Sequence, residues 1–99
     1  IIDYVGLVEC LKIEYDPDKN LKNIKKHKIS FETAIIFFQD PNPDVEFDED
    51  NSLYEDRYRG TFRYNDHYLF IVYTMRGEAI RLISARLATK VEIERYYER

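Results

Sequence analysis

Three strand-like segments separated by two tight-turn signals most limit what this chain can fold into. Residues 54–64 alternate between two faces, residues 68–74 are apolar almost throughout, and a third segment covers about residues 78–86. The turn signals are Asn65-Asp66 and Arg76-Gly77, whose residue types favour tight turns. Strands joined by tight turns pair antiparallel. The pattern therefore predicts two consecutive hairpins that share a central strand covered on both faces.

A fourth strand is predicted near the start of the sequence. Apolar and charged residues alternate from Leu11 to Asp16, with the period of two that marks a half-buried strand. We expect this strand to cover about Val5–Tyr15, with a possible break at Gly6.

Asp16-Pro17 predicts the start of a helix. Asp can accept hydrogen bonds from unpaired backbone N–H groups, and Pro at the first helical position has no N–H to leave unpaired. The helix is expected to run to about Lys26. Its apolar face is thin, with Leu21 and Ile24, and lysines occupy much of the rest. Most of this helix should therefore lie on the surface.

Two further helices are predicted from their capping residues. Ser30 offers an N-cap, and the apolar residues after it have the spacing that packs one helix stripe against a core, namely Phe31, Ala34, Ile35 and Phe38. Asp40-Pro41 ends this helix. Thr89 and Glu92 form a T-x-x-E capping box, which predicts a short helix up to the last residues.

The predicted element order is β-α-α-β-β-β-α, which indicates an α+β fold. We expect a small, mainly antiparallel sheet with its helices packed on one side. The 99 residues suit one domain over 1–99, in which residues 1–11 form a possible N-terminal extension. Residues 40–53, with two prolines, are expected to be an acidic loop.

Charge is unevenly distributed along the chain, although the net charge is −4. Residues 40–56 hold eight acids and no Lys or Arg, so the other residues hold 11 of the 19 acids against all 15 bases. The body of the protein therefore has a net charge of +4, and a basic surface beside an acidic segment is compatible with binding nucleic acid.

Several classes of protein are disfavoured. The longest uncharged run, residues 68–75, is far shorter than the roughly 18 to 20 apolar residues of a membrane span, and no basic-then-apolar leader opens the chain. The single cysteine, Cys10, suits a reducing cytoplasm and has no second Cys with which to hold zinc. His27 and His67 lie far apart, and no phosphate-binding glycine motif is present. We therefore expect a cytoplasmic protein with no metal, no cofactor and no membrane partner.

The remaining reactive groups are cations and hydroxyls. RNA cleavage without metal needs a base, an acid and cations that stabilise the phosphorane charge, and His, Lys, Tyr and Arg can fill these roles. The candidates at the end of the first helix, in the hairpins and after the acidic segment are Lys26, His27, Tyr73, Arg76, Arg81, Ser84, Arg86, Arg57, Arg59 and Arg63.

Structural roles are possible for the same residues. His27 can stabilise the negative end of a helix dipole, and the lysines can form a solvated face. Arg81 lies among apolar residues and should either pair with a carboxylate, such as Glu78 or Asp16, or face a groove. Arg86 can pair with Glu92 or Glu94, His67 is expected in an exposed turn, and Cys10 in the core.

Two spaced patterns and a short tail resemble a known family. The first is Tyr15-Asp16-x-x-Lys19-x-x-x-Asn23-x-x-Lys26-His27-x-Ile29-x-Phe31-Glu32-x-Ala34. The second is Val72-Tyr73-Thr74-x-Arg76-Gly77-x-x-Ile80-Arg81-x-Ile83-Ser84-Ala85-Arg86-x-Ala88-Thr89, and the tail is Glu94-x-Tyr96. Together they resemble BrnT-type toxins, the ribonuclease halves of bacterial type II toxin–antitoxin pairs. Lys28 stands where that family usually has Gly, and Leu87 where a second basic residue is common.

The resemblance implies a RelE-like fold and metal-independent RNA cleavage that inhibits translation. It also implies neutralisation by a BrnA-type antitoxin with a ribbon-helix-helix domain, and contact with operator DNA only through the antitoxin complex. The implied catalytic residues are His27 or Lys26 for proton transfer, Arg81 and Arg76 as phosphate clamps, and, as a weaker candidate, Tyr73. The implied RNA-binding residues are Lys19, Arg57, Arg59 and Arg86. The alternative is a non-catalytic RelE-like domain that binds an acidic protein segment or nucleic acid.

Overall fold

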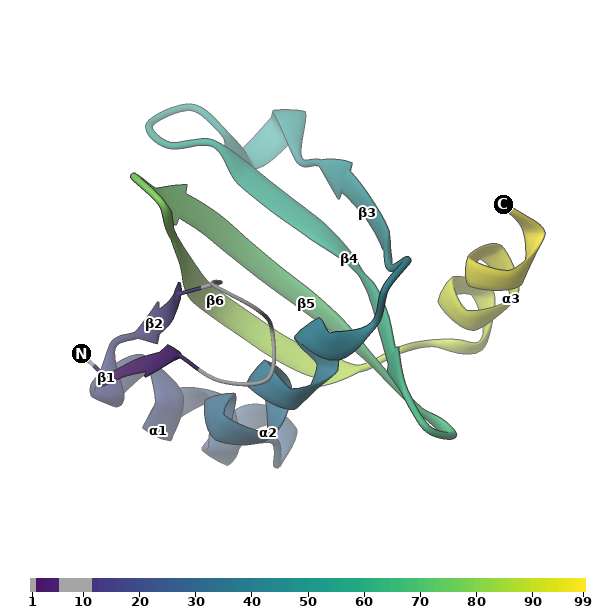
Figure 1. Cartoon of the computed structure of the whole chain (residues 1–99), viewed down its shortest axis with the longest axis horizontal. Coiled ribbons are helices and arrows are strands. Elements are labelled where there is room, and N and C mark those ends of the chain that lie inside the picture. The colour runs from purple at the N-terminus through teal and green to yellow at the C-terminus, as the bar shows by residue number, and fades with distance from the viewer. Residues whose placement is uncertain (1, 6–11) are drawn as a thin grey trace.

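The computed structural model describes residues 2–5 and 12–99 and has an α+β fold (Figure 1). The strands are β1 (Ile2–Val5), β2 (Lys12–Tyr15), β3 (Asp44–Phe47), β4 (Arg57–Tyr64), β5 (His67–Arg76) and β6 (Ala79–Leu87). The helices are α1 (Pro17–His27), α2 (Phe31–Ile36) and α3 (Lys90–Glu98), and the short 3₁₀ turns are η1 (Phe37–Gln39) and η2 (Glu49–Asn51). None of these helices is long and apolar enough to cross a membrane.

The strands form one six-stranded sheet in the order β1-β2-β6-β5-β4-β3. β4, β5 and β6 form the two predicted antiparallel hairpins, with β5 as the central strand. β2 pairs with β6 in parallel, so the sheet is mixed. The single first strand of the prediction is wrong in part, because β1 and β2 are separate strands that pair antiparallel. Gly6 and Cys10 lie outside the described residues.

The predicted acidic loop over residues 40–53 is also corrected by the structure. Asp44–Phe47 is a strand, β3, that pairs with β4 at the edge of the sheet. Its acidic side chains reach cations: Glu46 pairs with Arg59 at 3.1 Å, and Asp44 pairs with Arg95 of α3 at 3.3 Å. In sequence this segment looks like a solvated loop. Cations from other elements pair with its acids, and the segment forms an ordered strand.

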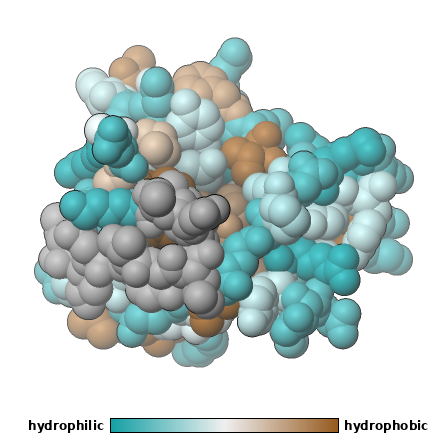
Figure 2. Space-filling view, viewed as in Figure 1, coloured by the Kyte–Doolittle hydropathy of each residue, from teal (hydrophilic) through white to brown (hydrophobic). Residues whose placement is uncertain are grey.

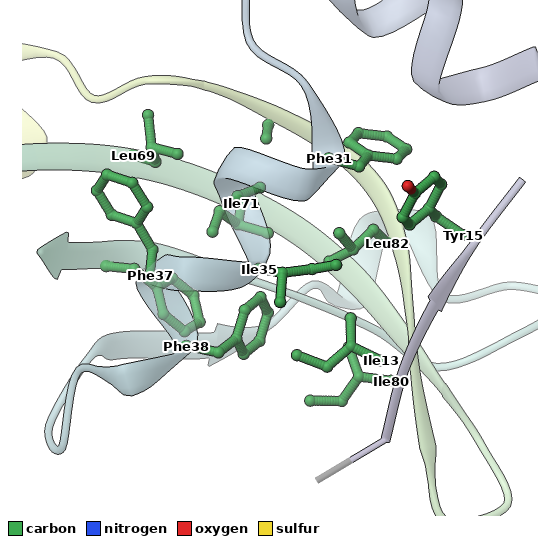
Figure 3. Close-up of a cluster of buried hydrophobic side chains, with 13 residues drawn as sticks. Ile13, Tyr15, Phe31, Ile35, Phe37, Phe38, Leu69, Ile71, Ile80 and Leu82 are labelled. Atoms are coloured by element: carbon green, nitrogen blue, oxygen red, sulfur yellow. The ribbon is translucent and has the colours of Figure 1, made fainter. Parts of the chain in front are cut away.

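One face of the sheet carries the hydrophobic core, which α2 covers (Figure 3). Phe31, Ala34, Ile35 and Phe38 are all buried there, as the helical spacing predicts. They pack with residues of β5 and β6 that point to the same face, including Ile71 and Leu82. The predicted caps Asp16, Ser30 and Thr89 each accept a backbone N–H, and the capping box of Thr89 is complete.

The opposite face of the sheet is polar and is contacted by α3. Asp44 and Glu46 lie opposite Thr61 and Arg59, on the face away from the core. Both carboxylates pair with Arg95 of α3. The prediction that the helices pack on one side is therefore wrong for α3.

Helix α1 is mostly exposed, as predicted, but the residue that it buries is polar. Leu21 is 65% exposed and Ile24 is also exposed, so the expected apolar face does not enter the core. Asn23 is the buried residue of this helix, with an exposure of 6%.

Lys28 ends α1 in the left-handed conformation, with φ 61° and ψ 25°. A side chain with a Cβ is strained there, whereas glycine is not. We expect Lys28→Gly to raise the free energy of unfolding by about 1 kcal/mol in urea denaturation. Lys28→Ala is the matched control because it removes the same side chain and keeps the Cβ. Equal stabilities of the two variants would contradict the assignment of strain.

Candidate functional site

A bulge in β6 shapes the surface beside α1. Leu82 pairs with Tyr73 and Ser84 with Val72, so Ile83 is an extra residue between two consecutive partners on β5. β2 pairs with β6 only as far as Arg81, so in the described sheet the later part of β6 has a neighbouring strand, β5, on one edge and none on the other. A side chain from α1 forms hydrogen bonds with the backbone of β6 at this point.

Asn23 takes the place of the missing strand. Its amide Nδ2 donates to the carbonyl oxygens of Ala85 at 2.9 Å and Ile29 at 2.8 Å, and its Oδ1 accepts the backbone N–H of Ala85 at 3.1 Å. Both backbone groups of Ala85 are therefore bonded to one side chain. This pairing fixes α1 along β6.

A groove of about 300 Å³ lies between α1 and the bulge. Lys19, Lys22 and Lys26 have the spacing that places them on one stripe of a helix, and this stripe lines the groove. His27, at the end of the helix, lines it as well. The lining is completed by Asn23, Ile83 and Ser84. The structure thus brings together the predicted residues Lys19, Lys26 and His27.

The lysines of this groove carry uncompensated charge. Lys19, Lys22 and Lys26 are exposed, and within the described part of the chain none of them pairs with a carboxylate. Three ammonium groups on one helix stripe attract a polyanion. The imidazole of His27 has ring nitrogens that can accept or donate a proton in a reaction. The groove therefore combines three ammonium groups, which can attract an anion, with an imidazole and the Ser84 hydroxyl.

The predicted arginines lie elsewhere, on the polar face of the sheet. Arg57 and Arg59 point to this face from β4, and Arg81 and Arg86 point to it from β6, opposite Thr74 and Phe70. Each of them is paired with a carboxylate: Arg57 with Glu55, Arg59 with Glu46 and Asp48, Arg81 with Glu14, and Arg86 with Glu92. These four guanidinium groups are already neutralised in this conformation.

Arg81 pairs with a carboxylate, as predicted, but the partner is Glu14 and neither of the two named examples. Its Nη1 lies 3.4 Å from Glu14 Oε1, and both side chains are largely buried. The parallel register of β2 with β6 places Glu14 directly beside Arg81. This long-range pairing replaces the expected contact with Glu78 or Asp16.

Arg86 has the predicted partner Glu92. The guanidinium donates from Nη1 and Nη2 to the two carboxylate oxygens, each at 2.8 Å, and it lies 4.3 Å from the ring centroid of Phe70. Burial opposes the charged carboxylate, but the hydrogen bonds from Arg86 and Thr89 outweigh it, so the pKa of Glu92 is lowered. Glu92 thus joins α3 to the sheet.

Acid should weaken this link. The pKa of Glu92 is lower in the folded state than its ordinary 4.5, so its contribution to stability is present at neutral pH and is lost as the pH falls below about 4.5. Glu92→Gln should lower the free energy of unfolding by about 1 to 2 kcal/mol at pH 7, and the difference from wild type should shrink in acid. Urea denaturation between pH 3 and 7 measures this. Glu94→Gln, at an exposed position without an ion pair in the described structure, is the control. A difference that does not change with pH would contradict the role of Glu92.

The structure separates Tyr73 and Arg76 from the groove. Tyr73 points to the core face, where it stacks on Tyr58 with ring centroids 5.6 Å apart and meets Phe38 edge-on. Burial, with a smaller effect of Tyr58, raises the pKa of Tyr73. Arg76 is exposed at the end of β5 and has no carboxylate partner in the described structure. The predicted exposed turn position of His67 is close to the observed one, because His67 is an exposed residue at the start of β5.

Asn23 stands in the first family pattern, but sequence reasoning gave it no role and did not single out Lys22. The usable signal for Asn23 was a polar residue in the middle of a helix whose apolar face is too thin to hold it on a sheet. Lys22 could have been found from its position three residues after Lys19 and four before Lys26, which places all three on one helix stripe.

The chain matches one protein family. The sequence model described as the ribonuclease toxin BrnT of type II toxin–antitoxin systems matches residues 15–92. This range contains all of α1, all strands from β3 to β6 and every residue that lines the groove. No curated protein matches the chain.

Proposed function

Since the chain belongs to the BrnT family of ribonuclease toxins from type II toxin–antitoxin systems, we propose that it cleaves RNA in the groove between α1 and β6. One observation carries this placement: the unpaired lysines, His27 and Ser84 all line one groove. The ammonium groups of these lysines make no ion pair in the described structure. They can therefore contact a phosphate without first breaking an ion pair. The arginines on the sheet would first have to leave their carboxylates.

The proposed chemistry needs only the chain's own groups and requires no metal. The RNA 2′-oxygen attacks the adjacent phosphorus while its proton passes to His27. The bond from phosphorus to the 5′-oxygen breaks, and this oxygen takes a proton from Lys26. The products are a 2′,3′-cyclic phosphate and a 5′-hydroxyl. Lys19 and Lys22 stabilise the phosphorane charge, and the Ser84 hydroxyl orients a phosphate oxygen.

The other predicted site residues receive different parts in this proposal. Arg57, Arg59, Arg81 and Arg86 hold the polar sheet face together through their ion pairs and contact RNA only at its margin. Arg76 is exposed at the β5–β6 hairpin and contributes a phosphate contact outside the groove. Tyr73 supports the core rather than the reaction.

Family membership also supports a biological setting. We propose that cleavage inhibits translation and that a cognate antitoxin neutralises the protein. The BrnA type of this antitoxin, its ribbon-helix-helix domain and its contact with operator DNA are further predictions from the family, as are the RelE-like assignment of the fold and the location in the cytoplasm.

Incubation of the purified, antitoxin-free protein with a defined single-stranded RNA in EDTA tests the proposal. We expect cleavage that persists in EDTA and leaves 2′,3′-cyclic phosphate ends. RNA that binds without being cut would instead favour the alternative, a non-catalytic interaction domain. Loss of cleavage in EDTA would contradict the metal-independent chemistry.

A further inference from the structure

The outer edge of β3 pairs with no other strand in the described sheet. β3 is the last strand of the sheet, and its register pairs Glu46 with Arg59 and Asp44 with Thr61. The N–H of Asp48 continues the ladder by donating to the carbonyl of Arg57 at 2.8 Å. Because hydrogen-bonded positions alternate along an antiparallel pair, the backbone groups of Val45 and Phe47 point away from β4. No strand in the described part of the chain pairs with them.

The two faces of this edge have different chemistry. Val45 packs against the core cluster, and Phe47 lies beside Tyr58, with ring centroids 5.6 Å apart, while remaining 44% exposed. Asp44 and Glu46 point to the opposite face. A strand added at this edge would alternate in the same way, with apolar side chains beside Val45 and Phe47 and the intervening side chains beside the acids.

The acidic side has a surplus of negative charge. Among residues 2–5 and 12–99, only two guanidinium groups, those of Arg59 and Arg95, pair with the carboxylates of Asp44, Glu46 and Asp48. One negative charge therefore remains uncompensated beside the edge. This favours Lys or Arg at the intervening positions of an added strand.

The connection that follows β3 also exposes apolar and acidic side chains. Leu53 is 81% exposed and Tyr54 is 95% exposed, an adjacent pair of large side chains facing solvent. Figure 2 shows hydrophobic residues at the rim of the molecule where the β3–β4 connection lies. The exposed acids Glu49, Asp50 and Asp56 have no cation partner in the described structure. This surface combines apolar and acidic groups.

We propose that the outer edge of β3 is a docking site for an extended segment of the cognate antitoxin, which adds to the sheet as a further strand. This inference rests on the proposed function, because the family supplies the antitoxin. The segment alternates apolar residues with Lys or Arg. A protein segment fits better than RNA because the surplus acids repel phosphate, whereas unpaired backbone groups bind a strand directly.

A peptide probe tests the edge without requiring the antitoxin. The probe is a capped octapeptide of alternating Lys and Val, and the reference is a capped octapeptide of alternating Glu and Val. We expect the Lys-Val peptide to slow hydrogen exchange at the Val45 and Phe47 amides and to bind at least tenfold tighter than the Glu-Val peptide. Equal affinity of the two peptides, or no protection of these amides, would overturn the proposal.

A matched pair of variants separates backbone pairing from nonspecific hydrophobic binding. Phe47→Pro removes the outward N–H, which an edge strand tolerates, while Phe47→Ala removes the ring and keeps the N–H. We expect Phe47→Pro to bind the Lys-Val peptide at least tenfold more weakly than Phe47→Ala, with similar far-ultraviolet circular dichroism for both. Equal binding by the two folded variants would refute strand addition.

The same variants distinguish this proposal from the proposed ribonuclease function. Phe47 does not line the α1–β6 groove, so RNA cleavage by the free protein should be the same for Phe47→Pro and Phe47→Ala. Titration of each cleaving variant with the antitoxin should then show weaker inhibition of Phe47→Pro. Cleavage with unchanged inhibition rejects the docking site alone, whereas peptide binding without RNA cleavage rejects the ribonuclease alone.

Discussion

Asn23→Ala is expected to lower the free energy of unfolding by about 2 to 4 kcal/mol, the largest stability loss that we predict for a single substitution. The side chain is buried and bonds to both backbone groups of Ala85 and to the carbonyl of Ile29. Alanine leaves these groups without partners, and each buried polar group left unsatisfied costs about 1 to 3 kcal/mol. Partial access of water to the released groups keeps the expected total below the sum of the three. Urea denaturation followed by circular dichroism measures the loss.

Lys22→Ala is the matched control for this prediction. Lys22 precedes Asn23 on α1, is exposed and makes no ion pair in the described structure, so its loss should change stability by less than about 0.5 kcal/mol. Hydrogen exchange at the Ala85 amide provides a local readout, which should become faster in Asn23→Ala only. If Asn23→Ala were no less stable than Lys22→Ala, the side chain would not be holding α1 on β6.

Local sequence patterns predicted the hairpins and most helix boundaries. β4, β5 and β6 are joined by short turns, so their pairing depends on residues close in the chain. The capping residues Ser30 and Thr89 likewise act within three residues of themselves. These elements are predictable because the residues that contact each other are also close together in the sequence.

Elements stabilised by distant charges were harder to predict. β3 looks like an acidic loop because its pairing depends on Arg59 of the next strand and Arg95 of the last helix. The partner of Arg81 was missed for the same reason, since Glu14 reaches it only through the parallel pairing of β2 with β6. A sequence pattern shows that a charge needs a partner, but the sheet topology decides which partner it finds.

The candidate site was predictable in composition but not in geometry. Lys19, Lys26 and His27 were identified before the fold was known and do line one groove. The arginines were expected to join them, yet strand alternation turns Arg81 and Arg86 to the polar sheet face. The structural role of Asn23 was missed because it depends on the bulge at Ile83, which has no signal of its own in the sequence.

Removing either His27 or Lys26 is expected to have the largest effect on activity. His27→Ala removes the proposed proton acceptor, and general acid–base catalysis contributes about 10²- to 10⁴-fold to a rate. Lys26→Ala removes the proposed proton donor and a cation beside the phosphate, and a loss of at least about 10²-fold is expected. Initial rates on a defined RNA substrate measure both, and unfolding curves show whether the variants remain folded.

Two matched variants test whether the groove, rather than residue type, determines these losses. Lys25 lies next to Lys26 but does not line the groove, and His67 is exposed at the start of β5, also outside it. Lys25→Ala and His67→Ala should therefore retain cleavage within about threefold of wild type, as expected for surface groups away from the reaction. If Lys26→Ala and Lys25→Ala lowered the rate equally, the lysines would act only through overall charge. If His27→Ala cut RNA as fast as His67→Ala, His27 would not be the proton acceptor of the reaction, and this part of the proposed mechanism would be wrong.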